Sequence, residues 1–219
     1  MLESKHMDKL ESYLLQHIPE RAGVMDDLEQ YAKAHQVPIM DPASMNFLTQ
    51  LVRMYKPKSI LEIGTAIGYS ALRMLEAQPD AQLVTIEKNE AMYELAKKNI
   101  DLHHQSFDIT LKHGDAIDVI DELTSEDATF DFIFIDAAKA QYKKYFEAVQ
   151  ALTNNHAVII CDNILFKGYV VDETKVEKKR LQSLVKKIQQ FNIWLTEQSD
   201  YQTSIVPIGD GMSISVKLV

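Results

Sequence analysis

Cysteine is almost absent from this chain of 219 residues, in which Cys161 is the single example. One thiol cannot form a disulfide within the chain, and such usage is typical of proteins from a reducing compartment. Apolar runs long enough to span a membrane are also lacking, and the first residues lack the apolar core of a signal peptide. These absences argue against a membrane-spanning protein and a disulfide-stapled secreted domain, and we expect a cytoplasmic protein without membrane partners.

Internal repeats, low-complexity segments and Cys–His clusters of the zinc-binding kind are missing as well. What remains is ordinary globular composition, with 46% apolar and 25% charged residues. The length suits one domain with a sizeable core. We predict a single domain over residues 1–219, with an N-terminal helical cap at 1–56 and an α/β core at 57–219.

The net charge of −9 argues at first against a nucleic-acid partner, but the charge is unevenly distributed. Residues 139–190 hold ten Lys or Arg against five Asp or Glu, a balance of +5, whereas the rest of the chain stands at −14. A basic segment of this kind can attract a polyanion. A solvated helix face is an equally good interpretation of the charge alone.

Hydrophobic periodicity predicts helices first and alternating strands and helices afterwards. The expected N-terminal helices cover 8–17, 24–36 and 42–55. Short apolar runs, each followed by a helical pattern, lie at 59–63, 82–86, 107–111, 130–135 and 156–161. A long helix is expected at about 173–192, and two strands at 201–206 and 212–218 flank a turn at 209–211. This order predicts an α/β fold with a mostly parallel seven-stranded sheet, helices on both faces and an antiparallel C-terminal hairpin.

The turn after the first strand has the features of a cofactor site. Gly64 ends the strand and Gly68 begins the next helix, so that backbone N–H groups can approach a ligand closely. The spacing is G-x-x-x-G, without the middle glycine of the dinucleotide fingerprint. Glu62 supplies a carboxylate suited to the cationic amino group of a methionine moiety. S-adenosylmethionine is therefore the expected cofactor, and Thr65 and Ser70 of the same turn are expected contacts.

Acidic residues after the next two strands extend this prediction. Glu87 ends the second strand, at the distance from Gly64 where a carboxylate binds ribose hydroxyls. Because both NAD and S-adenosylmethionine contain that ribose, Glu87 does not separate them. After the third strand, Asp115 or the backbone of Ala116 is expected near the adenine amine, although an Asp at that point is also a common helix cap.

A third group of polar residues follows the fourth and fifth strands. Asp136 ends the fourth strand, and Asp162 and Asn163 end the fifth. If these strands neighbour the first, three oxygen side chains converge beside the cofactor turn and suit Mg²⁺ or another hard divalent cation. Lys139 lies one helical turn after Asp136 and could accept a proton from a substrate hydroxyl or favour its ionised form.

The segments 61–70, 135–139 and 162–163 together resemble the cation-dependent O-methyltransferases that include the catechol and caffeoyl-CoA enzymes. The resemblance implies a class I methyltransferase (Rossmann-like) fold, S-adenosylmethionine and Mg²⁺ as cofactors, and a homodimer. It implies metal ligands at Asp136, Asp162 and Asn163, and a catalytic role for Lys139 together with Asp136. The implied cofactor contacts are Met40, Gly64, Ser70, Glu87, Ala116 and Asp136.

Segments 37–40, 165–168, 191–194 and 207–211 resemble a bacterial branch of this family that methylates tRNA. That branch converts 5-hydroxyuridine at the wobble position to 5-methoxyuridine, so the anticodon region would be the partner of the basic segment 139–190. One alternative is an O-methyltransferase of small catechols or phenols. Another is an NAD-binding oxidoreductase, which Glu62 and the missing middle glycine disfavour.

Overall fold

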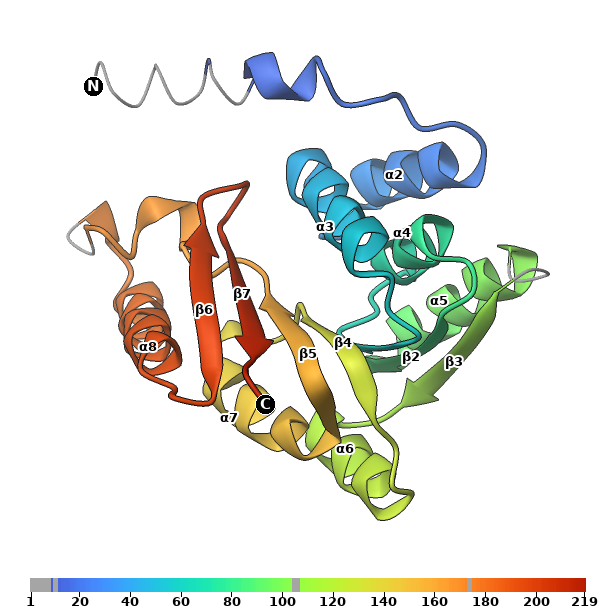
Figure 1. The fold of residues 1–219 in the computed structure, drawn as a ribbon. Coiled ribbons are helices and arrows are strands. Elements are labelled where there is room, and N and C mark those ends of the chain that lie inside the picture. The colour runs from blue at the N-terminus through green and yellow to red at the C-terminus, as the bar shows by residue number, and fades with distance from the viewer. Residues whose placement is uncertain (1–8, 10–11, 104–106, 173–174) are drawn as a thin grey trace.

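The computed structural model describes residues 9, 12–103, 107–172 and 175–219 (Figure 1). The strands are β1 (Ser59–Ile63), β2 (Gln82–Glu87), β3 (Asp108–His113), β4 (Phe130–Ile135), β5 (Thr153–Cys161), β6 (Tyr201–Val206) and β7 (Met212–Lys217). The α-helices are α2 (Val24–His35), α3 (Pro42–Tyr55), α4 (Tyr69–Ala77), α5 (Glu90–His103), α6 (Ala116–Ser125), α7 (Tyr142–Val149) and α8 (Lys179–Thr196). Short 3₁₀ turns lie at η1 (Lys139–Gln141), η2 (Gln150–Leu152) and η3 (Phe166–Gly168).

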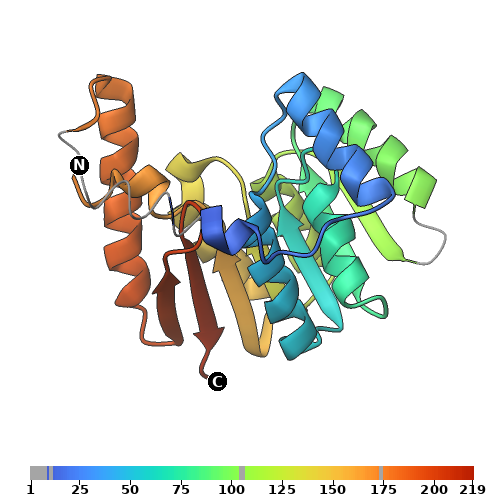
Figure 2. The same cartoon turned by 90° about the horizontal axis from the view of Figure 1, so that it is seen from above.

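One seven-stranded sheet forms the centre of the molecule, in the order β3-β2-β1-β4-β5-β7-β6. The first five strands are parallel, and β7 pairs antiparallel with both β5 and β6. Figure 2 shows α8 beside β6 at one edge of the sheet and α5 near β3 at the other. The predicted parallel sheet with an antiparallel C-terminal hairpin is confirmed.

Both faces of the sheet are covered because the central strands are apolar on both sides. Ile60 of β1 packs in a core cluster with α3 and α4, whereas its neighbour Leu61 packs in a second cluster with α6, α7 and α8. Phe132 and Ile133 of β4 divide in the same way. This alternation is the two-residue period of an extended strand. One apolar run in the sequence therefore contributes side chains to the hydrophobic cores on both faces of the sheet.

The predicted boundaries agree closely in the sheet and less well near the basic segment. Residues 173–174 of the helix expected at about 173–192 lie outside the described residues, and the helix begins at Lys179 and ends at Thr196. Val176 is buried before the helix, and its carbonyl accepts a hydrogen bond from the Gln182 side chain. Residues 8, 10 and 11 of the helix expected at 8–17 lie outside the described residues. In the described part of that segment, residues 12–15 are helical. None of the described helices is long and apolar enough to cross a membrane.

The order of the strands places the ends of β1, β4 and β5 next to one another, as the predicted site requires. Backbone hydrogen bonds continue past the strands: Asp136 N–H donates to the Ile63 carbonyl at 3.0 Å, and Asp162 N–H donates to the Ile135 carbonyl at 3.1 Å. The residues that leave the sheet at this edge are therefore held in register. In an open α/β sheet this edge is where ligands bind.

Candidate active site

A cavity of about 1210 Å³ lies at this carboxyl edge of the sheet. Its wall contains ten of the thirteen residues proposed from the sequence, which come from segments far apart in the chain. These are Met40, Gly64, Thr65, Ser70, Glu87, Ala116, Asp136, Lys139, Asp162 and Asn163. The three that do not line it are Glu62, Gly68 and Asp115.

Gly64 allows the chain to turn sharply at the bottom of the cavity. Its φ is +102°, and a Cβ added there would lie 2.0 Å from the carbonyl oxygen of Asp136. No side chain fits this approach, so glycine is required where β1 and β4 leave the sheet together. Gly68, with φ of +87°, caps the N-terminus of α4 and lies behind the wall. Gly68 therefore shapes the turn, and its direct contact with a cofactor stays a prediction.

Glu62 lies beneath the cavity wall and is fully buried. Its two carboxylate oxygens accept hydrogen bonds from the hydroxyls of Ser70 and Thr85, each at 2.5 Å. Burial raises the pKa of this carboxyl to about 7, although the two hydroxyls oppose the rise. The geometry thus makes Glu62 a support for Ser70, which does line the cavity, and contact between Glu62 and a methionine amino group stays a prediction.

Glu87 closes the glycine turn from the β2 side. One of its oxygens accepts from the backbone N–H of Ala66 at 2.8 Å, and the other accepts from Asn89 N–H at 2.7 Å. The carboxylate is thereby held at the cavity wall, where its further lone pairs can accept from ligand hydroxyls. This position suits the predicted ribose contact.

The structure separates the two alternatives proposed after β3. Asp115 caps α6 by accepting from Ile117 N–H at 3.1 Å, and its other oxygen pairs with the Lys88 ammonium at 2.7 Å. Ala116 lies on the cavity wall. The Ala116 backbone is therefore the better placed group for an adenine ring, and the Asp115 carboxylate has the structural role of a helix cap.

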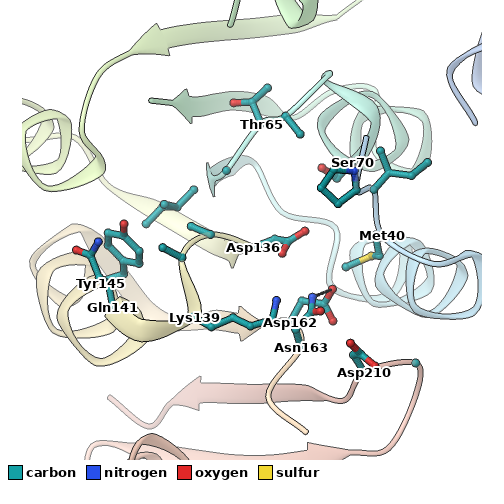
Figure 3. A pocket seen from close by; sticks show the side chains of 18 of the residues that line it. Met40, Thr65, Ser70, Asp136, Lys139, Gln141, Tyr145, Asp162, Asn163 and Asp210 are labelled. Atoms are coloured by element: carbon teal, nitrogen blue, oxygen red, sulfur yellow. Dashed lines mark hydrogen bonds between the residues drawn. The ribbon is translucent and has the colours of Figure 1, made fainter. Parts of the chain in front are cut away.

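Asp136, Asp162 and Asn163 are brought together by the neighbouring ends of β4 and β5. Figure 3 shows these side chains turned into the same space, with the Lys139 ammonium beside Asp162 and Asn163. Asn163 adopts a left-handed backbone conformation (φ +60°), and its amide nitrogen donates to Asp162 Oδ2 at 2.7 Å. Tyr142 donates its buried hydroxyl to the Asp162 carbonyl at 2.7 Å and fixes the backbone there.

Burial and mutual repulsion disfavour the ionised forms of the two carboxylates in this group, and Lys139 opposes this effect. Burial, and then repulsion from Asp136, raise the pKa of Asp162 to about 7. Burial also raises the pKa of Asp136, against which Lys139 acts. Asp162 Oδ1 is buried and has no hydrogen-bond partner, which is costly unless a ligand satisfies it. Two carboxylates and one amide oxygen fit a hard divalent cation; no cluster of three His, Cys, Asp or Glu within the described ranges adds a competing metal site.

Several lining residues were not expected from the sequence: Asp41, Gln141, Tyr145 and Asp210. Tyr145 lies in α7 at a position that its helical spacing marks as core. Asp41 is also the N-cap of α3, where it accepts hydrogen bonds from Ala43 N–H and Ser44 N–H, both at 3.0 Å. Asp210 sits in the hairpin turn between β6 and β7. No local pattern could have revealed these neighbours, because only the tertiary fold brings them to the cavity.

Comparison with known proteins identifies relatives of similar length. The model of a family described as O-methyltransferase matches residues 16–218. A catechol O-methyltransferase from Niastella koreensis is 33% identical over 81% of both chains, and caffeoyl-CoA O-methyltransferase 1 from Arabidopsis thaliana is 28% identical over 94% of this chain and 83% of its own.

Solved structures agree with this match. A Staphylococcus aureus protein provisionally named caffeoyl-CoA O-methyltransferase is 37% identical, with a TM-score of 0.87 over 94% of this chain and 98% of that one. An O-methyltransferase from Bacillus cereus, solved with S-adenosylhomocysteine, is 27% identical, with a TM-score of 0.81 over 95% and 97% of the two chains. The class I methyltransferase architecture expected from the sequence is thereby confirmed.

Proposed function

The chain belongs to the O-methyltransferase family, and from this premise we propose that it transfers the methyl group of S-adenosylmethionine to a hydroxyl of its acceptor, with a divalent cation as a second cofactor. The observation that carries the proposal is the buried, unpartnered Oδ1 of Asp162 beside Asp136, Lys139 and Asn163, in the same cavity as the glycine turn. An NAD-dependent oxidoreductase has no use for this arrangement, and the family match is against it.

S-adenosylmethionine, when bound, supplies an electrophilic methyl group on a sulfonium. The residues placed to hold it line one side of the cavity: the backbone at Gly64, Ser70 and Met40 for the methionine part, Glu87 for the ribose and Ala116 for the adenine. Ser70 is oriented by Glu62, and the turn is held by Glu87 through Ala66 N–H. The S-adenosylhomocysteine in the related Bacillus cereus structure supports this choice of cofactor.

Oxygens of Asp136, Asp162 and Asn163 would hold a divalent cation, and Mg²⁺ is the cation that we propose. When bound, such a cation orients an oxygen acceptor and favours its ionised form. The two carboxylates fit this role because burial raises their pKa values and Lys139 favours their ionised forms, as a bound cation would.

Lys139 is the group placed to act on the proton of the acceptor. It lies in η1, directly after the end of β4, and its ammonium stands beside Asp162 and Asn163 (Figure 3). From there it can stabilise an oxyanion or, after losing its own proton, accept the hydroxyl proton. Tyr142 and the short 3₁₀ turn fix the backbone on both sides of the site.

For the acceptor we propose 5-hydroxyuridine at the tRNA wobble position, whose 5-hydroxyl lies beside the 4-oxygen. Exposed basic side chains gather on α7 and α8 and in the segment between them, where phosphate contacts would supply affinity. They are Lys143, Lys144, Lys167, Lys175, Lys178, Lys179, Arg180 and Lys187. Lys167 also lines the cavity.

A small catechol or phenol is the second candidate acceptor, and the names of the catechol and caffeoyl-CoA relatives favour it. The two acceptors share a hydroxyl next to a second oxygen, so the same metal chemistry serves either. A homodimer, expected from the family resemblance, stays a proposal.

The acceptors are separated by incubating the enzyme with labelled S-adenosylmethionine, Mg²⁺ and either tRNA carrying 5-hydroxyuridine or a catechol. We expect the labelled methyl group to appear in the tRNA at low micromolar enzyme concentration. The amount of labelled tRNA should fall as the salt concentration rises, because phosphate contacts are weakened by salt. Labelling of catechol alone would show that the second candidate acceptor is correct and that tRNA is not the acceptor. Labelling of neither, with S-adenosylhomocysteine still bound, would refute both.

A further inference from the structure

Asp210 presents a carboxylate to the cavity that the proposed reaction does not yet use. It lies in the turn between β6 and β7 and lines the same cavity as the metal-binding set. Figure 3 shows its side chain on the same side of the cavity as Asp162 and Asn163. In the part of the chain that the structure describes, no hydrogen bond or ion pair engages its carboxylate, whereas both oxygens of Asp41 nearby are engaged.

The backbone of Asp210 is clamped from one side by the segment that follows β5. Its carbonyl accepts hydrogen bonds from Leu165 N–H at 2.8 Å and Phe166 N–H at 3.2 Å, and the next carbonyl, of Gly211, accepts from Ile164 N–H at 3.0 Å. This segment begins directly after Asn163. Three backbone hydrogen bonds therefore hold the main chain of Asp210 and Gly211 next to the segment that follows Asn163.

The glycines on either side of Asp210 fix the turn from both directions. A Cβ on Gly209 would lie 2.1 Å from side-chain oxygens of Asp41 and Ser44, at the start of α3. A Cβ on Gly211 would lie 2.2 Å from the side chain of Leu165. Both glycines have positive φ, at +54° and +84°. Glycine is therefore required on both sides of Asp210, where α3 and the Leu165 side chain approach the turn closely.

A half-buried carboxylate that lines a cavity and has no hydrogen-bond partner among the described residues can accept a hydrogen bond from a ligand that enters the cavity. We propose that Asp210 accepts a hydrogen bond from the N3–H of the 5-hydroxyuracil ring, an inference that rests on the proposed tRNA acceptor. In that ring the 5-oxygen and 4-oxygen are adjacent and would face the metal-binding set, and N3–H is the next group along the same edge. A catechol offers a C–H there and would leave the carboxylate unpaired.

The test compares two anticodon stem-loop RNAs that differ in one methyl group. Both carry 5-hydroxyuridine at the wobble position, and in one of them N3 is methylated. Methyl transfer to each is measured for the wild type, Asp210→Ala, Asp210→Asn and the control Asp200→Asn. Asp200 is exposed at the other end of the same hairpin, away from the turn. Asp200→Asn therefore removes one negative charge, as Asp210→Asn does, without changing the cavity. Thermal melting verifies that each variant folds.

We expect the wild type and Asp200→Asn to prefer the N3–H substrate by roughly 100-fold in kcat/KM, as loss of a hydrogen bond to a charged group predicts. Asp210→Ala should lose about tenfold or more on that substrate and retain only a few-fold preference. Asp210→Asn should lie between the two, because its neutral amide oxygen can still accept from N–H.

Three results would overturn the inference. If Asp210→Ala kept the wild-type preference for the N3–H substrate, this side chain would not recognise N3–H. The proposed tRNA acceptor would be unaffected by that result. A tenfold weaker affinity of Asp210→Asn for Mn²⁺, measured by electron paramagnetic resonance, would make Asp210 a metal ligand instead. A wild type that methylates catechol and neither RNA would remove the acceptor itself, and with it the role of Asp210.

Discussion

Replacing Glu62 with glutamine should stabilise the protein in alkaline solution and have little effect in acid. The carboxyl is fully buried and accepts two hydroxyl hydrogen bonds. A glutamine has the same shape and carries no charge, and the hydroxyls of Ser70 and Thr85 can rotate to suit its amide. The substitution therefore removes the ionisation of Glu62 while keeping the packing.

The size of the effect follows from the pKa of Glu62, which burial raises from 4.5 to about 7. Because the folded state holds the proton more tightly, the stabilisation due to this proton is complete below the unfolded value. It is lost as the pH rises through 7. At roughly 1.4 kcal/mol for each pH unit between the two values, the wild type loses about 3 kcal/mol relative to the variant between pH 4.5 and pH 8.

Urea unfolding of both proteins from pH 4.5 to pH 8 measures this difference. Subtracting the two free energies of unfolding cancels the titrating groups that both proteins share, apart from the smaller coupling of Glu62 to Asp136 and Glu87. Glu94→Gln, at an exposed position of α5, controls for a change in overall charge. A difference between Glu62→Gln and wild type that stays constant across this pH range would refute the reasoning, whatever its absolute size.

Further predictions concern the cavity itself. Asp162→Ala should abolish turnover yet leave calorimetric binding of S-adenosylhomocysteine within a few-fold of wild type, since Asp162 is assigned to the metal; unchanged turnover would remove the metal from the mechanism. Lys139→Met should lower kcat by about 10²- to 10⁴-fold, with KM for the donor unaltered, and a small loss would restrict Lys139 to a structural role. Mg²⁺ should raise the melting temperature and EDTA should reverse this, because a cation relieves the repulsion between Asp136 and Asp162; an identical melting curve argues against the site. Gly64→Ala should unfold at clearly lower urea than Gly23→Ala. Both glycines have positive φ, but only Gly64 has a carbonyl 2.0 Å from the added Cβ, so equal midpoints would contradict the contact.

Much of the fold followed from local patterns. Short apolar runs identified the strands β1, β4 and β5, and hydrophobic periodicity identified a helix at 42–55, which is α3. The start of α8 was predicted at about residue 173, but the helix begins at Lys179. The buried Val176 belongs to the segment that precedes the helix and not to its apolar face. Hydrophobic spacing alone cannot separate these cases, since both bury apolar side chains at similar intervals.

The sequence by itself also determined the chemistry of the strand ends, because parallel strands deliver the residues that follow them to one edge. Glu87, Asp136, Asp162 and Asn163 reached the cavity for that reason. Only the tertiary structure decided which of these side chains line the cavity. Glu62 lies beneath the wall and accepts a hydrogen bond from Ser70, and Asp115 caps α6 and pairs with Lys88. Asp210 joined the site through a hairpin that closes on α3. Side-chain direction and long-range packing are properties of the assembled layers, and no local pattern encodes them.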